Sequence, residues 1–367
     1  MRKIKLKELA SYNKGQQING NMLLNEGKYE YLNGGINPSG KWNEYNVEGN
    51  TIAISEGGNS CGYVNYMNRN FWCGAHCYYL FNIKCNVKYL FYNLKYNERR
   101  LQNIRSGACM PNIKKKELGE FEIFIDEDIK SQNKIASYLD RISYIMQNRK
   151  KQIEELDELI KSQFVEMFEN NEYIEKKKII NICKSIVRGP FGSALKKEFF
   201  VPKGENTYKV YEQKNAINED SLLGTYYIDE NKFNELKRFE CKPGDIIMSC
   251  SGTIGKIYQL PNDIEKGVIN QALLKFTLDY SKVLPIYFLE FIKSNIQNLE
   301  TKGTGLQNLG SVSYIKEMEI PVPTMEQQKQ FVELVEQIDK QKFEIQKSLE
   351  EMQLLQESLM NSYFGEM

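Results

Sequence analysis

A chain of 367 residues is longer than a single hydrophobic core usually serves, so two or more domains are expected. The chain holds only one histidine, which excludes most mechanisms that need a serine–histidine or cysteine–histidine pair. The net charge of +1 is low for a protein that binds a polyanion, so the distribution of charge matters more than its total.

The charge falls into four segments. Residues 1–125 hold 17 Lys or Arg against 10 Asp or Glu, and residues 172–323 hold 21 against 19. Residues 126–171 hold 7 against 10, and residues 324–367 hold 4 against 9. The first and third segments are therefore basic and the other two acidic. This pattern is typical of a protein whose basic parts meet duplex DNA.

The sequence predicts neither a membrane segment nor an export signal. No apolar run approaches the roughly 20 residues that span a bilayer, and the opening stretch MRKIKLKEL lacks the apolar core of a signal peptide. We therefore expect a cytoplasmic protein without membrane contact, whose eight cysteines are reduced thiols.

The first segment, residues 1–125, has the short strands and frequent turns of an α+β domain. Glycine-rich turns at 33–35, 37–40 and 56–59 separate apolar runs, and strands are predicted at 51–55 and 77–83.

One stretch of this segment has two interpretations. Cys73, His76 and Cys77, with Cys61 and Cys85 on either side, offer enough ligands for zinc. However, the chain has no Cys-x-x-Cys pair, and FWCGAHCYYLF is also typical of a buried strand with small residues for close packing. His76, the lone histidine, is then structural.

The second segment is repeated later in the chain. Residues 130–168 align with residues 326–364 at a constant offset of 196, without a gap. A single duplication explains this agreement better than a shared helical composition. The identical pairs are Gln132/Gln328, Ile142/Ile338, Lys151/Lys347, Glu154/Glu350, Glu155/Glu351, Leu159/Leu355, Ser162/Ser358 and Phe168/Phe364.

Both repeated segments are predicted to be long amphipathic helices, because apolar residues recur at alternating steps of three and four. Such a helix buries its apolar seam, and the other copy is the obvious antiparallel partner. In the alternative interpretation, each helix packs on its own globular domain. The predicted pairing residues are Ile135, Leu139, Ile142, Ile153, Leu156, Phe331, Val335, Ile338, Leu349 and Met352.

The third segment, residues 172–323, has a similar α+β pattern. Strands are predicted at 208–211, 245–249 and 273–278, and the turn at 242–245 introduces the second of these. The stretches GNTI and GDII, each a turn leading into an apolar strand, occupy equivalent places in the two basic segments. These segments are therefore predicted to be diverged copies of one domain.

Signatures of common nucleic-acid enzymes are absent from the sequence. Residues 37–40, NPSG, lack the second proline and the aromatic residue of the amino-methyltransferase tetrad. Residues 251–257, SGTIGKI, lack the glycine spacing and the final hydroxyl residue of a phosphate-binding loop. We therefore expect a protein with no catalytic centre, cofactor or metal site of its own.

Taken together, these motifs resemble the specificity subunits of type I restriction-modification systems. The boundary IPVPTMEQQKQFVELVEQID resembles the junction between a target-recognition domain and a conserved helix in that family. GDIIMSCSGTIGKIYQLP and INQALLKF resemble the middle of one such domain, and RGPFGSALKKEFF with YKVYEQKNA resembles its start. In the first copy, GGINPSGKWNEYN, GNTIAISEGGNSCGYVN and FWCGAHCYYL resemble the same regions. One departure is IFID at 123–126, where the family usually has prolines. The hinge between the first domain and its helix is therefore expected to differ.

The resemblance implies an α+β fold with two target-recognition domains in a pseudo-two-fold arrangement, separated by a coiled-coil strut of two long antiparallel helices. The domain boundaries then fall at 1–125, 126–171, 172–323 and 324–367. Each recognition domain would read half of a bipartite site in double-stranded DNA, with the helices setting the spacing.

The resemblance also implies partner proteins. The helices would bind two methyltransferase subunits, which carry S-adenosylmethionine, and ATP-dependent restriction subunits would join them. Two alternatives stay open: a specificity subunit of a type II fused methyltransferase-nuclease, and a coiled-coil scaffold that reads no DNA.

Candidate DNA contacts are the side chains that can reach base edges or phosphates, although a solvated surface charge is the competing interpretation of each. Arg188 is the strongest candidate, because a glycine and a proline follow it and restrain its loop. The full set is Lys41, Asn43, Arg69, Arg99, Arg100, Arg105, Arg188, Lys196, Lys197, Lys214, Lys256, Gln271 and Lys302.

Overall fold

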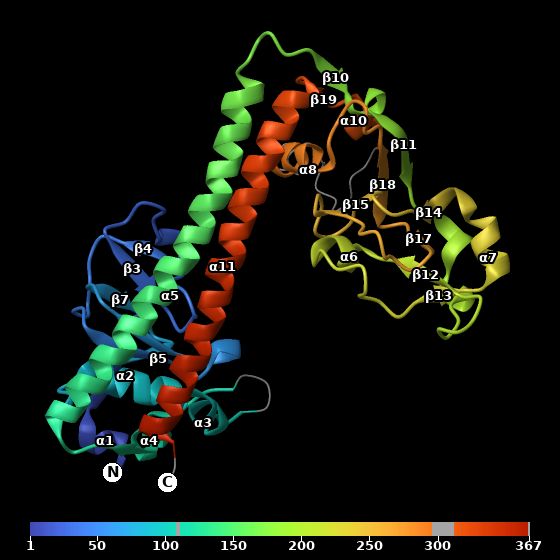
Figure 1. Cartoon of the computed structure of the whole chain (residues 1–367). Helices are drawn as coiled ribbons and strands as arrows, with labels where there is room; N and C mark the ends of the chain where they lie inside the picture. Colours follow the sequence, from blue (N-terminus) through green and yellow to red (C-terminus); the bar gives the residue numbers. More distant parts are fainter. Residues whose placement is uncertain (108–110, 296–311, 366–367) are drawn as a thin grey trace. The chain divides into compact units, whose positions relative to one another are not determined.

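The computed structural model describes residues 1–107, 111–295 and 312–365 (Figure 1). The chain forms two compact units: unit 1 comprises Met1–Lys151 and Gln346–Met367, and unit 2 comprises Gln152–Ile345. Each unit contains one α+β globular domain and about half of each of two long helices, α5 (Ile129–Phe164) and α11 (Met325–Phe364). The predicted fold class is confirmed in these elements. No helix in the described part of the chain combines the length and the apolar character that crossing a bilayer demands.

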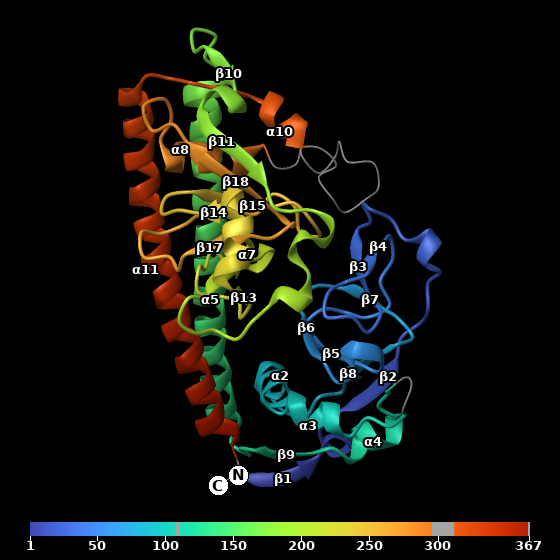
Figure 2. The same cartoon turned by 90° about the vertical axis from the view of Figure 1, so that its right-hand side faces the viewer.

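The globular domain of unit 1, called domain 1 (β1 to β9), contains a large and a small sheet, which lie one above the other in Figure 2, and a two-stranded ribbon of β1 and β9. Its large sheet has the order β2-β8-β5-β6 and is antiparallel throughout, and its small sheet has the order β4-β3-β7, in which β3 and β7 are parallel. The predicted strand 51–55 is β5, and the predicted strand 77–83 is β8, which ends at Phe81. The elements are β1 (Arg2–Lys5), α1 (Leu6–Leu9), β2 (Ser11–Lys14), η1 (Gly20–Met22), β3 (Tyr29–Leu32), β4 (Gly40–Trp42), β5 (Thr51–Ser55), η2 (Gly58–Ser60), β6 (Val64–Met67), β7 (Phe71–Cys73), β8 (Cys77–Phe81), α2 (Val87–Tyr96), α3 (Glu98–Asn103), α4 (Lys115–Glu120) and β9 (Glu122–Ile125).

The globular domain of unit 2, called domain 2 (β10 to β19), repeats this topology with one extra strand, β14, in its small sheet. Its large sheet has the order β11-β18-β15-β16, and its small sheet has the order β13-β12-β17-β14, with β12 and β17 parallel. The predicted strands 208–211 and 273–278 are β12 and β18, and the strand predicted at 245–249 is β15. The elements are η3 (Val165–Glu169, a π-helix), β10 (Lys176–Lys178), η4 (Ile179–Asn181), β11 (Cys183–Arg188), η5 (Gly192–Leu195), η6 (Lys197–Phe199), β12 (Tyr208–Tyr211), α6 (Gln213–Ile217), β13 (Tyr227–Ile228), α7 (Glu230–Glu235), η7 (Lys237–Phe239), β14 (Glu240–Cys241), β15 (Ile246–Ser249), β16 (Ile257–Gln259), β17 (Gly267–Ile269), β18 (Leu273–Leu278), α8 (Pro285–Ser294), α10 (Val312–Glu317) and β19 (Glu319–Pro321).

A short antiparallel ribbon closes each domain just before its long helix. In domain 1, β1 pairs with β9 over four residues, and in domain 2, β10 pairs with β19 over three. The second ribbon ends at Pro321, and proline has no N–H with which to continue a ladder. The IFID stretch that departs from the family pattern therefore forms the equivalent ribbon, one pair longer.

The two long helices begin at equivalent capped positions. Asp128 accepts hydrogen bonds from the backbone N–H of Lys130 and Ser131 at the start of α5. At the start of α11, Thr324 Oγ1 accepts from the N–H of Gln327, whose side chain accepts from the N–H of Thr324. The second arrangement is a capping box, and both caps satisfy N–H groups that a helix leaves open.

Within each unit the two helices pair in an antiparallel manner. In unit 1, Gln356 of α11 donates a 2.9 Å hydrogen bond to Ser143 of α5. In unit 2, Lys342 of α11 forms a 2.7 Å ion pair with Asp157 of α5. In the same unit Phe331 of α11 contacts Phe164 of α5 at 5.5 Å between ring centroids, so partner numbers rise along one helix as they fall along the other, as antiparallel pairing requires.

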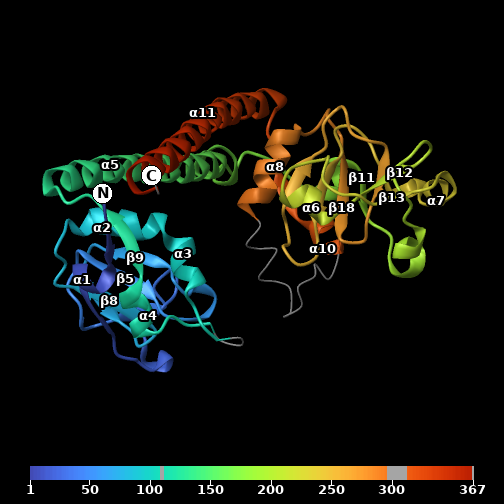
Figure 3. The ribbon, with the colours of Figure 1, turned by 90° about the horizontal axis from the view of Figure 1, so that it is seen from below.

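One short helix in each domain connects the large sheet to the long helices (Figure 3). In unit 2, Phe288 of α8 contacts Phe276 of β18 at 5.2 Å between ring centroids, and Phe291 of α8 contacts Phe164 of α5 at 6.1 Å. In unit 1, α2 takes the same place, with Phe91 beside Tyr66 of the β6 strand. Both units thus share a core made from sheet, short helix and long helices.

Candidate nucleic-acid interface

Several strand ends of domain 2 meet at one edge of its large sheet. Arg188, the last residue of β11, pairs with Leu274 of β18, and Ser249, the last residue of β15, pairs with Leu273. Antiparallel pairing therefore brings Arg188, the turn before β18 and the loop after β15 to the same edge, called the large-sheet edge. The exposed Gln271 lies in that turn, and its carbonyl oxygen accepts a long 3.5 Å hydrogen bond from Arg188 Nε. Two predicted residues are thus brought together.

The backbone around Arg188 fixes the position of its side chain. A Cβ on Gly189 would come within 1.9 Å of the Asn270 carbonyl oxygen, so only glycine fits there. The guanidinium lies 5.2 Å from the centroid of the Phe191 ring. Burial raises the pKa of the Cys250 thiol to about 11, and the charge of Arg188 partly opposes this rise. Arg188 therefore lies at the edge beside a thiol that stays neutral near pH 7.

The loop after β15 presents Lys256 at this edge. Ser249 Oγ donates a 2.6 Å hydrogen bond to the Thr253 carbonyl and accepts a 3.0 Å bond from the Lys256 N–H. Gly252 and Gly255 have φ of +65° and +80°, which favours glycine and closes the tight loop. Lys256 is exposed and forms no ion pair with a described residue.

The other predicted residues of domain 2 lie away from this edge or in ion pairs. Lys196 forms a 3.6 Å ion pair with the carboxylate two residues further on, and the neighbouring Lys197 is exposed. Lys214 of α6 is held by Glu212 at 2.6 Å. Lys302 lies outside the described residues.

In domain 1, Lys41 and Arg69 line one cleft of about 600 Å³ at the small sheet. Lys41 belongs to β4, and Arg69 lies in the turn between β6 and β7. The cleft also contains Lys28, Asn68 and Asn70, which were not predicted from the sequence. A signal for them was present, because NRN is a polar turn between two apolar strands.

Three further predicted residues of domain 1 are exposed. Asn43 follows β4, Arg99 lies on α3 and Arg105 follows α3. Within the described part of the chain, neither arginine forms an ion pair, so both are available to a polyanion. They do not line the cleft that contains Lys41.

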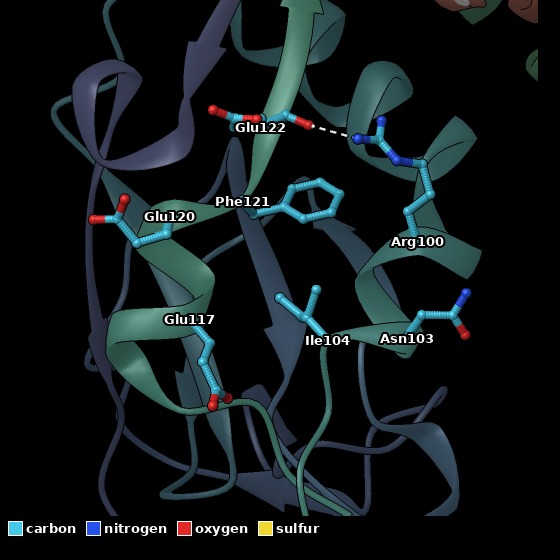
Figure 4. Close-up of a pocket in the computed structure, with 7 residues that line it drawn as sticks. All are labelled: Arg100, Asn103, Ile104, Glu117, Glu120, Phe121 and Glu122. Atoms are coloured by element: carbon cyan, nitrogen blue, oxygen red, sulfur yellow. Dashed lines mark hydrogen bonds between the residues drawn. The ribbon is translucent and has the colours of Figure 1, made fainter.

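Arg100 has structural partners instead (Figure 4). Its guanidinium donates to the side-chain oxygen of Asn97 at 2.7 Å and to the carbonyl of Glu122 at 3.2 Å. The pocket beside it is also lined by the carboxylates of Glu117, Glu120 and Glu122. Lys3 pairs with Glu122, and Lys5 and Lys7 pair with Glu120, so it is the hydrogen bonds of Arg100 itself that make this position less suited to DNA contact.

The large-sheet edge of domain 1 carries an ionic cluster that the sequence did not indicate. Lys14, the last residue of β2, forms an ion pair with Glu56, the residue after β5. His76 Nδ1 lies 3.9 Å from the same carboxylate, and its side chain is 66% exposed. Since Lys14 and Glu56 are far apart in sequence, only the sheet order brings them together.

The cysteine-rich stretch forms β7, a short turn and β8. Cys61 Sγ donates to the Glu56 carbonyl and Cys73 Sγ to the Cys77 carbonyl, while a hydrogen bond with Cys73 and burial raise the pKa of the Cys77 thiol. Metal binding needs thiolates, which this environment disfavours. In residues 1–107, 111–295 and 312–365, no three His, Cys, Asp or Glu side chains converge on a metal position. The zinc interpretation therefore gains no support.

The ten predicted pairing residues are all buried or half-buried. Ile135 and Leu139 pack in the core of unit 1 together with Phe364, and Phe331 and Val335 pack in the core of unit 2. The helix ends thus pack on a globular domain as well as on the partner helix. Half-buried seam residues are Ile153, Leu156 and Met352, and the remaining buried ones are Ile142, Ile338 and Leu349.

Most identical residues of the helical repeat are exposed rather than buried. Leu159 is 42% exposed and its equivalent Leu355 is 45% exposed. They lie in a stripe of exposed residues along one helix face, most of which are neighbours at steps of three or four positions. The repeated stripe consists of Lys151, Glu154, Glu155, Leu159 and Ser162 on α5, and of Lys347, Glu350, Glu351, Leu355 and Ser358 on α11.

These features define a duplicated α+β protein whose two domains share one topology and are linked by paired helices. The sequence model of the type I restriction modification DNA specificity domain matches residues 1–156 and 171–354. The match covers most of the chain and both copies of the fold, so the chain belongs to this family.

Relatives and solved structures agree with this assignment. Chains from Mycoplasma pneumoniae and Mycoplasma genitalium named as type I specificity subunits are each 35% identical, over 158 and 134 residues, or 42% and 36% of this chain. These stretches span only 40% and 35% of the two relatives. The type I restriction-modification S subunit from M. genitalium has a similar fold, with a TM-score of 0.62 at 20% identity, covering 100% of this chain and 96% of that one. A chain from a structure on complex assembly of a type I R-M system has a TM-score of 0.59 at 12% identity, covering 100% and 98%.

Proposed function

We propose that this chain is the DNA-recognition subunit of a type I restriction-modification complex, acting on duplex DNA in the cytoplasm. Each globular domain reads one half of a bipartite site, and the paired helices set the distance between the halves. The observation that carries this proposal is the family match over both copies of a duplicated fold. For this function we propose recognition domains at residues 1–125 and 172–323 and helical regions at residues 126–171 and 324–367.

The proposed contacts are the cationic and amide side chains at the sheet edges. In domain 2, Arg188 and Gln271 suit base edges in the major groove, and Lys256 suits a phosphate. In domain 1, Lys41 and Arg69 take part through the small-sheet cleft. Further phosphate contacts come from exposed residues with no ion pair to a described residue, namely Arg99 and Arg105 in domain 1 and Lys197 in domain 2, and the exposed Asn43 of domain 1 is a further candidate. Arg100 and Lys214 are less suitable, because structural partners already hold them.

Catalysis is assigned to partner subunits rather than to this chain. Two methyltransferase subunits would supply S-adenosylmethionine, and restriction subunits would supply ATP-driven cleavage. The exposed repeated stripe supports binding of two copies of one partner. Core packing does not require identical residues on exposed faces, whereas binding of the same protein at two sites requires them.

The test is to map N6-methyladenine across the host genome with and without this gene. We expect one bipartite motif to lose methylation when the gene is deleted, because the methyltransferase then has no reading subunit. Unchanged methylation would refute the proposal.

Two further experiments distinguish the proposed function from a scaffold that reads no DNA and from an enzyme that acts alone. A scaffold that reads no DNA predicts that exchanging a globular domain between homologues leaves the motif unchanged, whereas we expect that half of the motif to change. The purified chain, given S-adenosylmethionine and duplex DNA alone, should transfer no methyl groups; transfer without a partner would make it an enzyme.

A further inference from the structure

The repeated stripe of exposed residues on α5 and α11 encloses one position at which the two copies differ in chemistry. This position holds Glu158 on α5 and Leu354 on α11, and both side chains are exposed. Leu354 is four residues after Glu350 and four residues before Ser358, so it lies on the same helix face as the stripe. A partner that covers both stripes therefore meets a different surface on each helix.

On α11 this position enlarges an exposed apolar surface. Leu354 is 66% exposed, and the adjacent Leu355 of the repeated stripe is 45% exposed. Both leucines belong to unit 1. Because burial of apolar area is favourable in proportion to the area removed from water, a partner gains affinity from covering both side chains.

On α5 the same position is charged. Glu158 forms a 2.6 Å ion pair with Lys161, and their side chains are 71% and 47% exposed, respectively. The equivalent of Lys161 on α11 is Glu357, so the ion pair has no counterpart there. A partner that covers the α5 stripe therefore buries Leu159 but must also remove water from an ion pair, which costs free energy.

Exposed aromatic residues outside the stripe do not favour either helix. Tyr144 of α5 is 65% exposed, and Phe343 of α11 is 67% exposed. They precede the two stripes at positions that are not equivalent in the repeat, where the other helix has Lys340 and Gln147, respectively. The contrast between the two helices thus lies within the stripe itself.

From this contrast we propose that the two methyltransferase-binding stripes are unequal, and that the first methyltransferase copy binds at the α11 stripe. The proposal rests on the proposed function, which assigns one partner protein to both stripes. The same partner surface buries Leu354 and Leu355 at one site, but Leu159 and an ion pair at the other. Assembly is therefore sequential, and a complex with one methyltransferase copy precedes the complex with two.

The test adds increasing amounts of the methyltransferase of the same system to the full chain and measures the complexes with no, one and two copies by native mass spectrometry. Two identical independent sites would give stepwise dissociation constants that differ only by a statistical factor of about four. We expect a ratio above about ten, because burying a leucine side chain in place of a carboxylate changes affinity by about tenfold or more. A ratio at the statistical value would overturn the proposal.

Two single variants identify the stripe that is occupied first. Leu159→Asp blocks the α5 stripe, so the first copy should still bind with wild-type affinity. Leu355→Asp blocks the α11 stripe, so the first copy should bind about tenfold more weakly. The reverse result would place the first copy on α5 and contradict the proposal.

Two reciprocal double variants are matched controls, because each gives one stripe the residues of the other. Leu354→Glu/Glu357→Lys makes α11 like α5, and Glu158→Leu/Lys161→Glu makes α5 like α11. All four side chains are exposed, so neither variant should disturb the fold. The first variant should weaken the first binding step and the second should strengthen the second step, so both return the ratio to the statistical value.

A wild-type ratio in both reciprocal variants would overturn the role of these positions. Failure of the proposed function is a separate result, because the wild-type chain itself would then bind no methyltransferase copy.

Discussion

Two buried glutamines, Gln132 and Gln328, have the same role in the two units. The Gln328 side chain accepts a 2.9 Å hydrogen bond from the Leu284 N–H at the start of α8 and donates to the carbonyls of Lys282 and Pro323. In unit 1, Gln132 accepts from the backbone N–H that starts α2 and donates to the carbonyl before α5. In each unit, one glutamine side chain thus joins the start of a short helix to the start of a long helix. This role explains why both repeats have glutamine at this position.

We expect Gln328→Ala to lower the free energy of unfolding by roughly 1–3 kcal/mol, because it leaves buried backbone groups without partners. Gln328 is fully buried, so water cannot replace the lost amide. Chemical denaturation of the full chain, followed by circular dichroism, measures this change. The control is Gln346→Ala on the same helix, where the side chain is exposed and a change within about 0.5 kcal/mol is expected. Equal losses in both variants would argue against the bridging role.

At the scale of elements, each long helix ends in a phenylalanine that fixes it to a globular domain. Phe168, in the π-helical turn after α5, contacts Tyr287 of α8 at 5.1 Å between ring centroids. Phe364, at the end of α11, contacts Tyr89 of α2 at 5.3 Å. The end of α5 therefore packs on domain 2, and the end of α11 packs on domain 1. Each domain is thus contacted by the end of the long helix that follows the other domain in sequence.

We expect Phe364→Ala to destabilise unit 1 by roughly 3–5 kcal/mol, the usual cost of removing a buried phenylalanine side chain. Hydrogen exchange followed by mass spectrometry should show faster exchange in α2, whereas α8 of unit 2 keeps its protection. Phe343→Ala is the matched control, because Phe343 lies on the same helix but is 67% exposed. Loss of protection in α8 alone would contradict this assignment.

At the scale of the whole molecule, local patterns predicted the elements and the duplication. The bounds of β5, β12 and β18 agree with the sequence prediction, since a turn signal precedes each apolar run. The alternating three- and four-residue steps predicted α5 and α11 for the same reason: helical periodicity is a local property.

The grouping of charges could not be predicted in this way. Lys41 and Arg69 line one cleft because the parallel pairing of β3 with β7 connects distant segments. Arg100 has the same chemistry as Arg69, yet the Asn97 side chain and the Glu122 carbonyl already hold its guanidinium. Whether a cation is neutralised depends on sheet order and on partners far away in sequence, and a single sequence does not reveal these.

The repeated stripe on α5 and α11 leads to a prediction about assembly. Leu159 and Leu355 are exposed apolar residues at equivalent positions, so each would be buried by one copy of the methyltransferase. Burying an aspartate there without a partner is costly. We therefore expect Leu159→Asp to reduce the complex from two methyltransferase copies to one, and Leu159→Asp/Leu355→Asp to leave none. Native mass spectrometry of the co-purified complex measures the stoichiometry.

The control for this experiment is Phe343→Asp on α11. Phe343 is exposed and apolar, but its equivalent in the repeat is Gln147, so it does not belong to the stripe. This variant should keep both methyltransferase copies. Two copies retained by the double leucine variant would place the docking surface elsewhere, whereas loss of both copies in the single variant would mean that the two sites are coupled rather than independent.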